Sequence, residues 1–168
     1  MQIEHECKEN LIDVWYERAA ACQKCHYLAS ARYTKLHYYI GIPLIILAAS
    51  IGTTSFINIK EMQVSISLII GIGSMCIAVF SGLQTFLGLN EKSEKHQLYG
   101  ARYGSIGRKL EVLRNYPERC TFDQVEGIKL DLDKLALEAP KIPLDILAKV
   151  KRTYKNYEVS FGPIIDKV

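Results

Sequence analysis

Hydrophobic positions are concentrated in two long windows in the middle of the chain. Residues 36–59 contain no Asp, Glu, Lys or Arg, and after one Lys-Glu pair residues 62–90 contain none either. A helix rises about 1.5 Å per residue, so a helix over the first window is about 36 Å long and exceeds the roughly 30 Å hydrocarbon core of a bilayer. The mostly polar remainder holds too few apolar partners to surround two such helices. The pattern therefore predicts transmembrane helices over 37–59 and 63–89.

Apolar residues recur at helical spacing on both sides of these windows. Before the first window they are Leu11, Trp15, Cys22, Ala29 and Leu36. After the second they are Leu98, Ile106, Leu110 and Leu113. We expect both flanking helices to continue directly from the spans, the second ending near Pro117. Three glycines share one face of that second helix: Gly100, Gly104 and Gly107. Since each weakens the helix by about 1 kcal/mol relative to alanine, we expect another helix to pack closely there.

Two further helices are predicted beyond Pro117. Thr121 or Asp123 can cap the first of them. Its apolar positions are Val125, Ile128, Leu132 and Leu135. It must break at Pro140, and Pro143 suits the first turn of a last helix. No strand pattern or internal repeat occurs, so we expect one all-α domain. The predicted fold is a membrane protein built as a two-transmembrane helical hairpin, with long cytoplasmic helical extensions over 1–36 and 90–168.

Basic residues set the expected orientation. They flank both windows, whereas the loop between the windows contains only Lys60. The positive-inside rule then places both termini in the cytoplasm and residues 58–63 outside. Residues 1–36 are charged and lack an apolar signal-peptide core, so we expect the first span to direct insertion into the plasma (inner) membrane as part of a multi-pass protein. The net charge of +3 favours anionic lipid headgroups over nucleic acid as a partner.

The second span carries small and weakly polar side chains along one face. They recur at steps of four and three: Ser67, Gly71, Ser74, Ala78, Ser81 and Thr85. In lipid, such a face serves close helix packing, within the hairpin or between subunits. It also suits a pore wall, in which Gln84 would join the hydroxyl groups as a weakly selective polar lining. Two helices cannot enclose a channel, so the pore interpretation requires a homo-oligomer.

Two other sets of residues bear on that pore. The first span has a stripe of small residues suited to packing against the second: Gly41, Ala48, Gly52 and Ser55. At the inner end of the second span, a set of polar residues is suited to a ring at a pore mouth: Asn90, Glu91, Glu94 and His96. Two lysines are interleaved with that set, so a solvated interfacial turn of mixed charge is the alternative.

The string Cys22-Gln-Lys-Cys25-His26 matches the attachment motif of c-type haem. We nevertheless expect no cofactor and no metal. The motif lies in an inferred cytoplasmic helix, whereas covalent haem attachment belongs to the other face of a bacterial membrane. One cysteine pair is also only half of a tetrahedral zinc site. The cysteines are therefore interpreted as small apolar packing residues.

Catalytic signatures are missing from the sequence. The chain has no Walker loop, dinucleotide fingerprint, nucleophile elbow or metalloprotease helix. Asp131 and Asp133 are two residues apart, so they point to different faces of their helix. A membrane enzyme would need a polar cluster that we do not find, and we expect no enzymatic activity.

Four strings follow one another in a defined order. They are Ala31-Arg-Tyr-Thr-Lys before the first span, Gly82-Leu-Gln-Thr-Phe-Leu87 at the end of the second, Glu94-Lys-His96 with Tyr99 and Tyr103, and Ala139-Pro-Lys-Ile-Pro143. Between Trp15 and Leu147, this order and spacing resemble the SLATT superfamily. Its members are two-transmembrane effector domains associated with nucleotide-generating and nucleotide-sensing proteins in prokaryotic conflict systems.

The resemblance implies an all-helical protein that oligomerises and perforates the membrane when triggered, causing death or dormancy of an infected cell. The expected function is thus an oligomeric pore-forming effector in antiviral defence, opened by a separately encoded nucleotide-generating or nucleotide-sensing partner. The alternative is a non-conducting anchor or adaptor that recruits a soluble partner through the helices after Asn90. The family has no short catalytic motif, so only its architecture and its pore role carry over to this chain.

Overall fold

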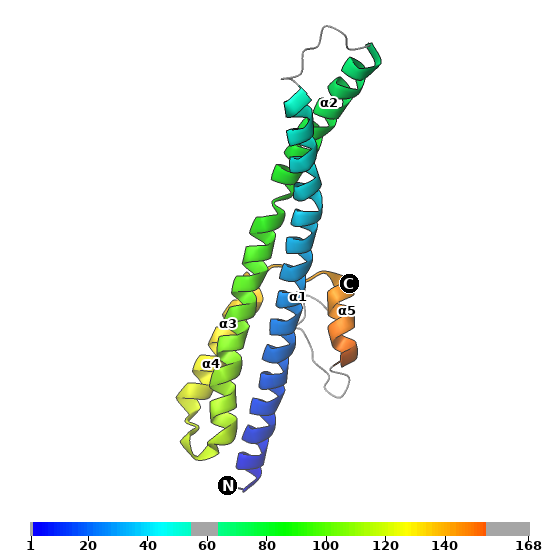
Figure 1. Cartoon of the computed structure of the whole chain (residues 1–168). Helices are drawn as coiled ribbons and strands as arrows, with labels where there is room; N and C mark the ends of the chain where they lie inside the picture. Colours follow the sequence, from blue (N-terminus) through cyan, green and yellow to red (C-terminus); the bar gives the residue numbers. More distant parts are fainter. Residues whose placement is uncertain (1, 55–63, 154–168) are drawn as a thin grey trace. The chain divides into compact units, whose positions relative to one another are not determined.

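The computed structural model describes residues 2–54 and 64–153, which form helices joined by short turns (Figure 1). In chain order the helices are α1 (Gln2–Thr54), α2 (Val64–Leu87), α3 (Leu89–Asn115), the 3-10 turn η2 (Pro117–Arg119), α4 (Phe122–Glu138) and α5 (Leu144–Thr153). These residues contain no strand, so the predicted all-α class is confirmed for them. The predicted outer loop, 58–63, lies outside this part of the chain.

Two helical segments are long and apolar enough to cross a membrane. They lie within α1 and within the run of α2 and α3, at Asn10–Thr53 and Ile66–Asn115. In their most apolar windows, only 6% and 0% of the residues are buried. A soluble protein covers helices of this kind with other side chains. The rest of the described chain therefore leaves both apolar surfaces uncovered.

One compact unit, Ala31–Ser93, pairs the second part of α1 with α2. A Cβ added at Gly41 would lie 2.9 Å from Gln84 Nε2, and one added at Gly73 would lie 2.7 Å from Ile51 Cδ1. As the number of the α1 residue rises, that of its α2 partner falls, so the two helices run antiparallel. Both approaches use glycine because a side chain there would occupy the space of its partner.

The second compact unit combines Met1–Ser30 with Glu94–Val168, and its core joins α1, α3 and α4. We call it unit 1. The buried cluster consists of Ile12, Ala19, Cys22, Tyr103, Ile106, Leu110, Leu113, Ile128 and Leu135. Most of the periodic positions of α3 and α4 are therefore in the core. Three periodic positions are exposed instead: Leu11, Leu36 and Leu98.

The close packing predicted along the glycine face of α3 is confirmed at two of its three positions. A Cβ at Gly100 would lie 3.0 Å from the ring of Tyr27, and one at Gly104 would lie 2.6 Å from Nε2 of Gln23. Both partners belong to α1. At Gly107 a Cβ would meet no atom within 4 Å. Two glycines of α3 therefore allow α1 to approach closely within unit 1.

Local signals decide where the helices end. Gly88 has a φ of 54°, a left-handed conformation that glycine adopts at low cost, and it separates α2 from α3. The expected continuous helix through this point is therefore wrong. At α4, Thr121 Oγ1 accepts from Gln124 N, and Gln124 Oε1 accepts from Thr121 N. This capping box confirms Thr121 as the cap, and α4 ends before Pro140 as predicted.

Candidate functional site

The small face of α2 is not covered by α1. We define it by six residues, all of them exposed: Ser67, Gly71, Ser74, Ala78, Ser81 and Thr85. The less exposed residues of the span form a different stripe: Ile70, Gly73, Ile77, Gln84 and Leu87. That stripe includes Gly73 and Gln84, which lie close to Ile51 and Gly41 of α1. At about 100° of turn per residue, the two faces are centred roughly 100° apart. Packing within the hairpin therefore does not use the small face.

Gln84 was predicted to line the pore together with the hydroxyl groups of the small face, but its side chain lies on a different face of α2. Its Nε2 lies 3.4 Å from Nδ1 of His37 and faces the backbone of Gly41. The side chain is thus held in the contact between α1 and α2. The structure brings together the six residues of the small face and leaves Gln84 on the neighbouring face.

Hydroxyl groups on the small face bond to their own helix. Ser74 Oγ donates to the carbonyl of Ile70 at 2.9 Å, and Thr85 Oγ1 donates to the carbonyl of Ser81 at 3.1 Å. A hydroxyl bonded to the preceding turn has its donor satisfied even in lipid, while its oxygen can still accept a hydrogen bond. The small face is therefore compatible with a helix contact and with water.

The small stripe on the first span is divided in a similar way. Gly41 is buried against Gln84, whereas Ala48 and Gly52 are exposed. A Cβ at Gly52 would meet no atom within 4 Å. Ser55 lies outside the described residues. Within the described part of α1, only Gly41 of this stripe supports close packing in the hairpin.

The residues proposed for a pore mouth lie on the first two turns of α3. Asn90, Glu91 and Glu94 are exposed there. Ser93 and His96 are buried, with 4% and 3% of their surfaces exposed. The grouping of His96 with the polar ring is therefore wrong. The three remaining residues form an exposed polar set at the start of α3.

His26 of α1 and His96 of α3 form a buried pair. Their Nδ1 atoms are 2.9 Å apart, and the Tyr103 ring stacks on His26 with 17° between the planes. Burial, and then the positive charge of a protonated His96, lower the pKa of His26 to about 4. Burial also lowers the pKa of His96. Both rings are therefore neutral near pH 7, so one Nδ1 donates a hydrogen bond and the other accepts it.

Sequence reasoning missed this pair, although each histidine extends a recognised pattern. His26 lies four residues after Cys22, on the buried face of α1, and His96 lies seven residues before Tyr103, on the buried face of α3. Both spacings return to the same side of a helix. The spacing could not predict that the two histidines contact each other, because they are 70 residues apart in sequence.

The thiols near this pair are packed and unreactive. Burial raises the pKa of Cys22 and of Cys25 to about 12, so both stay protonated at neutral pH. A protonated thiol is a poor nucleophile and a poor metal ligand. Within residues 2–54 and 64–153, no group of three or more His, Cys, Asp or Glu side chains is arranged to hold a metal ion.

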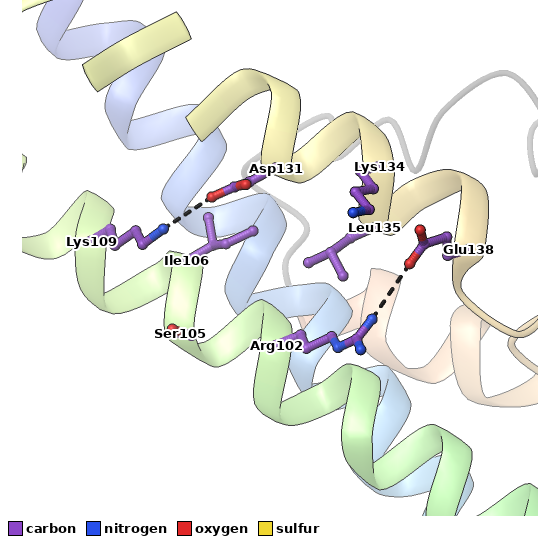
Figure 2. Close-up of a pocket in the computed structure, with 8 residues that line it drawn as sticks. All are labelled: Arg102, Ser105, Ile106, Lys109, Asp131, Lys134, Leu135 and Glu138. Atoms are coloured by element: carbon purple, nitrogen blue, oxygen red, sulfur yellow. Dashed lines mark hydrogen bonds and ion pairs between the residues drawn. The ribbon is translucent and has the colours of Figure 1, made fainter. Parts of the chain in front are cut away.

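An open groove of about 490 Å³ runs between α3 and α4 in unit 1 (Figure 2). Its apolar lining is Ile106 and Leu135. Two ion pairs bridge it: Lys109 Nζ to Asp131 Oδ2 at 3.0 Å, and Arg102 Nη1 to Glu138 Oε2 at 3.4 Å. All four charged side chains are about half exposed. The groove is thus a solvated contact between two helices in which these four charges are paired, and Lys134 also lines it.

These ion pairs are expected to contribute little to stability. In a double-mutant cycle with Lys109→Met and Asp131→Asn, the coupling free energy should be about 0.2–1 kcal/mol, because both side chains are solvated. Urea unfolding measures it. The coupling should decrease further in about 1 M NaCl, where charges are screened within about 3 Å. A coupling free energy above about 2 kcal/mol that does not change with NaCl concentration would contradict the conclusion that Lys109 and Asp131 form a solvated pair.

Two arrangements thus stand out among the described residues. One is the exposed small face of α2, and the other is the buried histidine pair between α1 and α3. No protein-family model, no curated protein and no solved structure matches the chain.

Proposed function

We propose that the chain is a membrane-spanning, homo-oligomeric pore-forming effector with both termini in the cytoplasm. The observation that carries this proposal is the small face of α2, which α1 leaves uncovered. Small, weakly polar faces in lipid favour close contact with another helix. Further copies of the chain supply such helices. Copies arranged around an axis normal to the membrane would turn their small faces toward that axis, where the hydroxyl oxygens can meet water.

Apolar side chains over the rest of the hairpin support its placement in lipid. Large exposed residues occur on both helices: Ile45, Ile46, Ile69, Met75, Val79 and Phe86. Moving apolar surface out of water is favourable by about 25 cal/mol per Å². Basic residues on both sides of the hairpin favour cytoplasmic termini. Asn90, Glu91 and Glu94 then lie at the inner end of the proposed pore.

Membrane potential and dye entry after induced expression test this function. Ser74→Leu combined with Ser81→Leu fills the small face with apolar bulk and removes two hydroxyl groups. At equal abundance in the membrane, we expect this double variant to abolish the depolarisation caused by the unsubstituted chain, because the small face can then neither pack closely nor hold water.

Cys76→Leu is the matched control. Cys76 is exposed on the same helix, about 180° around the axis from the centre of the small face. The control should depolarise cells as the unsubstituted chain does. Depolarisation by a folded Ser74→Leu/Ser81→Leu variant would exclude this lining. Equal loss in the control would show that bulk anywhere on the span is harmful, and the small face would lose its special role.

The resemblance to SLATT domains adds a trigger to this proposal. In an infected cell, a separately encoded nucleotide-generating or nucleotide-sensing partner would open the pore and cause death or dormancy. Co-expression with such a partner should then increase dye entry above the level that the chain produces alone. If dye entry did not depend on any such partner, the proposed trigger would be excluded and the proposed pore would still be supported.

A non-conducting adaptor is the second candidate, and one observation favours it. Large apolar side chains on α4 are exposed in unit 1: Phe122, Leu130 and Leu137. Exposed apolar side chains of this kind suit a protein contact. An adaptor should leave the membrane potential intact. It should also lose its soluble partner when Leu130→Ser and Leu137→Ser are combined, as measured by co-purification.

A further inference from the structure

The hydrogen bond between His26 and His96 needs at least one neutral ring, because one of the two Nδ1 atoms must offer a lone pair. The two Nδ1 atoms face each other at 2.9 Å. In the neutral pair, one of them carries the proton and the other a lone pair. When both rings are protonated, both Nδ1 atoms become donors, and two positive charges stand at hydrogen-bonding distance. The contact is then repulsive instead of attractive.

This contact lies where two glycines of α3 allow α1 to approach closely. Gln23 and Tyr27, on either side of His26, are the residues that meet Gly104 and Gly100. Both histidine side chains are almost fully buried, at 1% and 3% exposure. Water therefore cannot screen a second charge without the two helices moving apart.

We propose that the His26–His96 pair is a proton-sensitive latch that holds α1 against α3 in unit 1 and releases them when the second ring is protonated. The latch is a property of unit 1 by itself. Its use in gating rests on the proposed pore.

Burial lowers the pKa of both histidines, and the groups recorded beside the pair are neutral or positive. From α1 they are the protonated thiols of Cys22 and Cys25, with the cations of Arg18 and Lys24 next to those thiols. From α3 they are the phenols of Tyr99 and Tyr103, whose rings lie 6.1 and 5.6 Å from that of His26, centroid to centroid. Arg102 lies over the Tyr99 ring and is itself positive. The buried residues of α4 and α5 are all apolar.

The pKa of His26 sets the direction of the response. Burial lowers this pKa from 6.5 to about 4, so the released form binds the proton more readily than the latched form. The stability of the latch is therefore fully present above about pH 6.5 and is lost progressively as the pH falls toward about 4. Acidification of the cytoplasm acts in the direction of release.

Histidine NMR titration of the full-length protein in nanodiscs tests the latch directly. The chain has four histidines, so the ring signals can be assigned one by one by substitution. We expect the His26 and His96 rings to titrate below the ordinary histidine range. We also expect the fluorescence of Trp15, the one tryptophan, to change with the same midpoint, because Trp15 packs against the core of unit 1. Free titration of both rings in the ordinary range, with unchanged fluorescence, would overturn the proposal.

Variants separate the latch from general acid unfolding. In His26→Leu/His96→Leu both rings are replaced by apolar groups, so neither ring stays buried without its histidine partner. The fluorescence of this variant should be insensitive to acid over the range in which the unsubstituted chain responds. His37→Gln is the control, since it removes a histidine outside the pair and should keep the response. An identical acid response in the double leucine variant would exclude the pair as its source.

Dye leakage from vesicles containing the protein adds the functional measurement. Leakage should increase in the same acid range as the NMR transition, and the double leucine variant should lose this dependence. If both rings titrated at low pH but no dye leaked at any pH, the result would support the latch and count against the pore. Acid-dependent leakage that persists without the pair would keep the pore and exclude the latch.

Discussion

Leu110→Ala should lower the free energy of unfolding of unit 1 by about 3 kcal/mol. Leu110 is 1% exposed and lies in the buried cluster formed by α1, α3 and α4. Truncation removes apolar contacts and leaves a cavity between three packed helices, which can relax only partly. Urea unfolding followed by the fluorescence of Trp15, which packs against the same cluster, measures the loss.

Leu98→Ala is the matched control for this substitution. Leu98 lies on the same helix but is half exposed. Since little apolar surface is buried there, its truncation should change the free energy of unfolding by no more than about 0.5 kcal/mol. Equal losses at Leu98 and Leu110 would contradict the placement of the core on the Leu110 face of α3.

Gly73→Leu should destabilise the pairing of α1 with α2 by about 1–3 kcal/mol. A Cβ at this position would already lie 2.7 Å from Cδ1 of Ile51, so a leucine must displace that side chain or move the helices apart. Loss of helix by circular dichroism, measured while the denaturing detergent fraction is raised, reports the change. Ile51→Ala in the same chain should recover part of the loss, because it empties the space that the leucine needs.

Gly82→Leu separates this contact from the effect of leucine on the helix itself. A Cβ at Gly82 would meet no atom within 4 Å, and the residue lies on the same helix. Leucine has a higher helix propensity than glycine, so this variant should keep or slightly increase stability, by up to about 1 kcal/mol. If both leucine variants lost the same stability, the close approach of Gly73 to Ile51 would be contradicted.

Helix positions could be predicted because their signals are local. The capping box at Thr121 and the break before Pro140 each depend on residues within one turn. The sequence also identified the apolar windows, whose surfaces the described chain leaves uncovered. The helix break at Gly88 was not predicted, because an isolated glycine can also lie inside a helix. Only the φ of 54° at Gly88 reveals the break.

Helix phase was predicted less well. Leu98 has the spacing of a core residue and is exposed, because the position of α1 and α4 decides which side of α3 is covered. For the same reason, the prediction that Gln84 belongs with the small face is wrong, because its amide lies against His37 and Gly41. Spacing defines which residues share a face, but it does not say which face meets a neighbour.

The sequence by itself determined the all-α class, the two apolar windows and the composition of the small face, since all three follow from residues close together in the chain. Only the tertiary structure decided that this face is turned away from α1. It also decided that His26 meets His96 across 70 residues of sequence. Both depend on how separate helices pack, and a hydrogen bond between distant side chains has no periodicity by which a single sequence could reveal it.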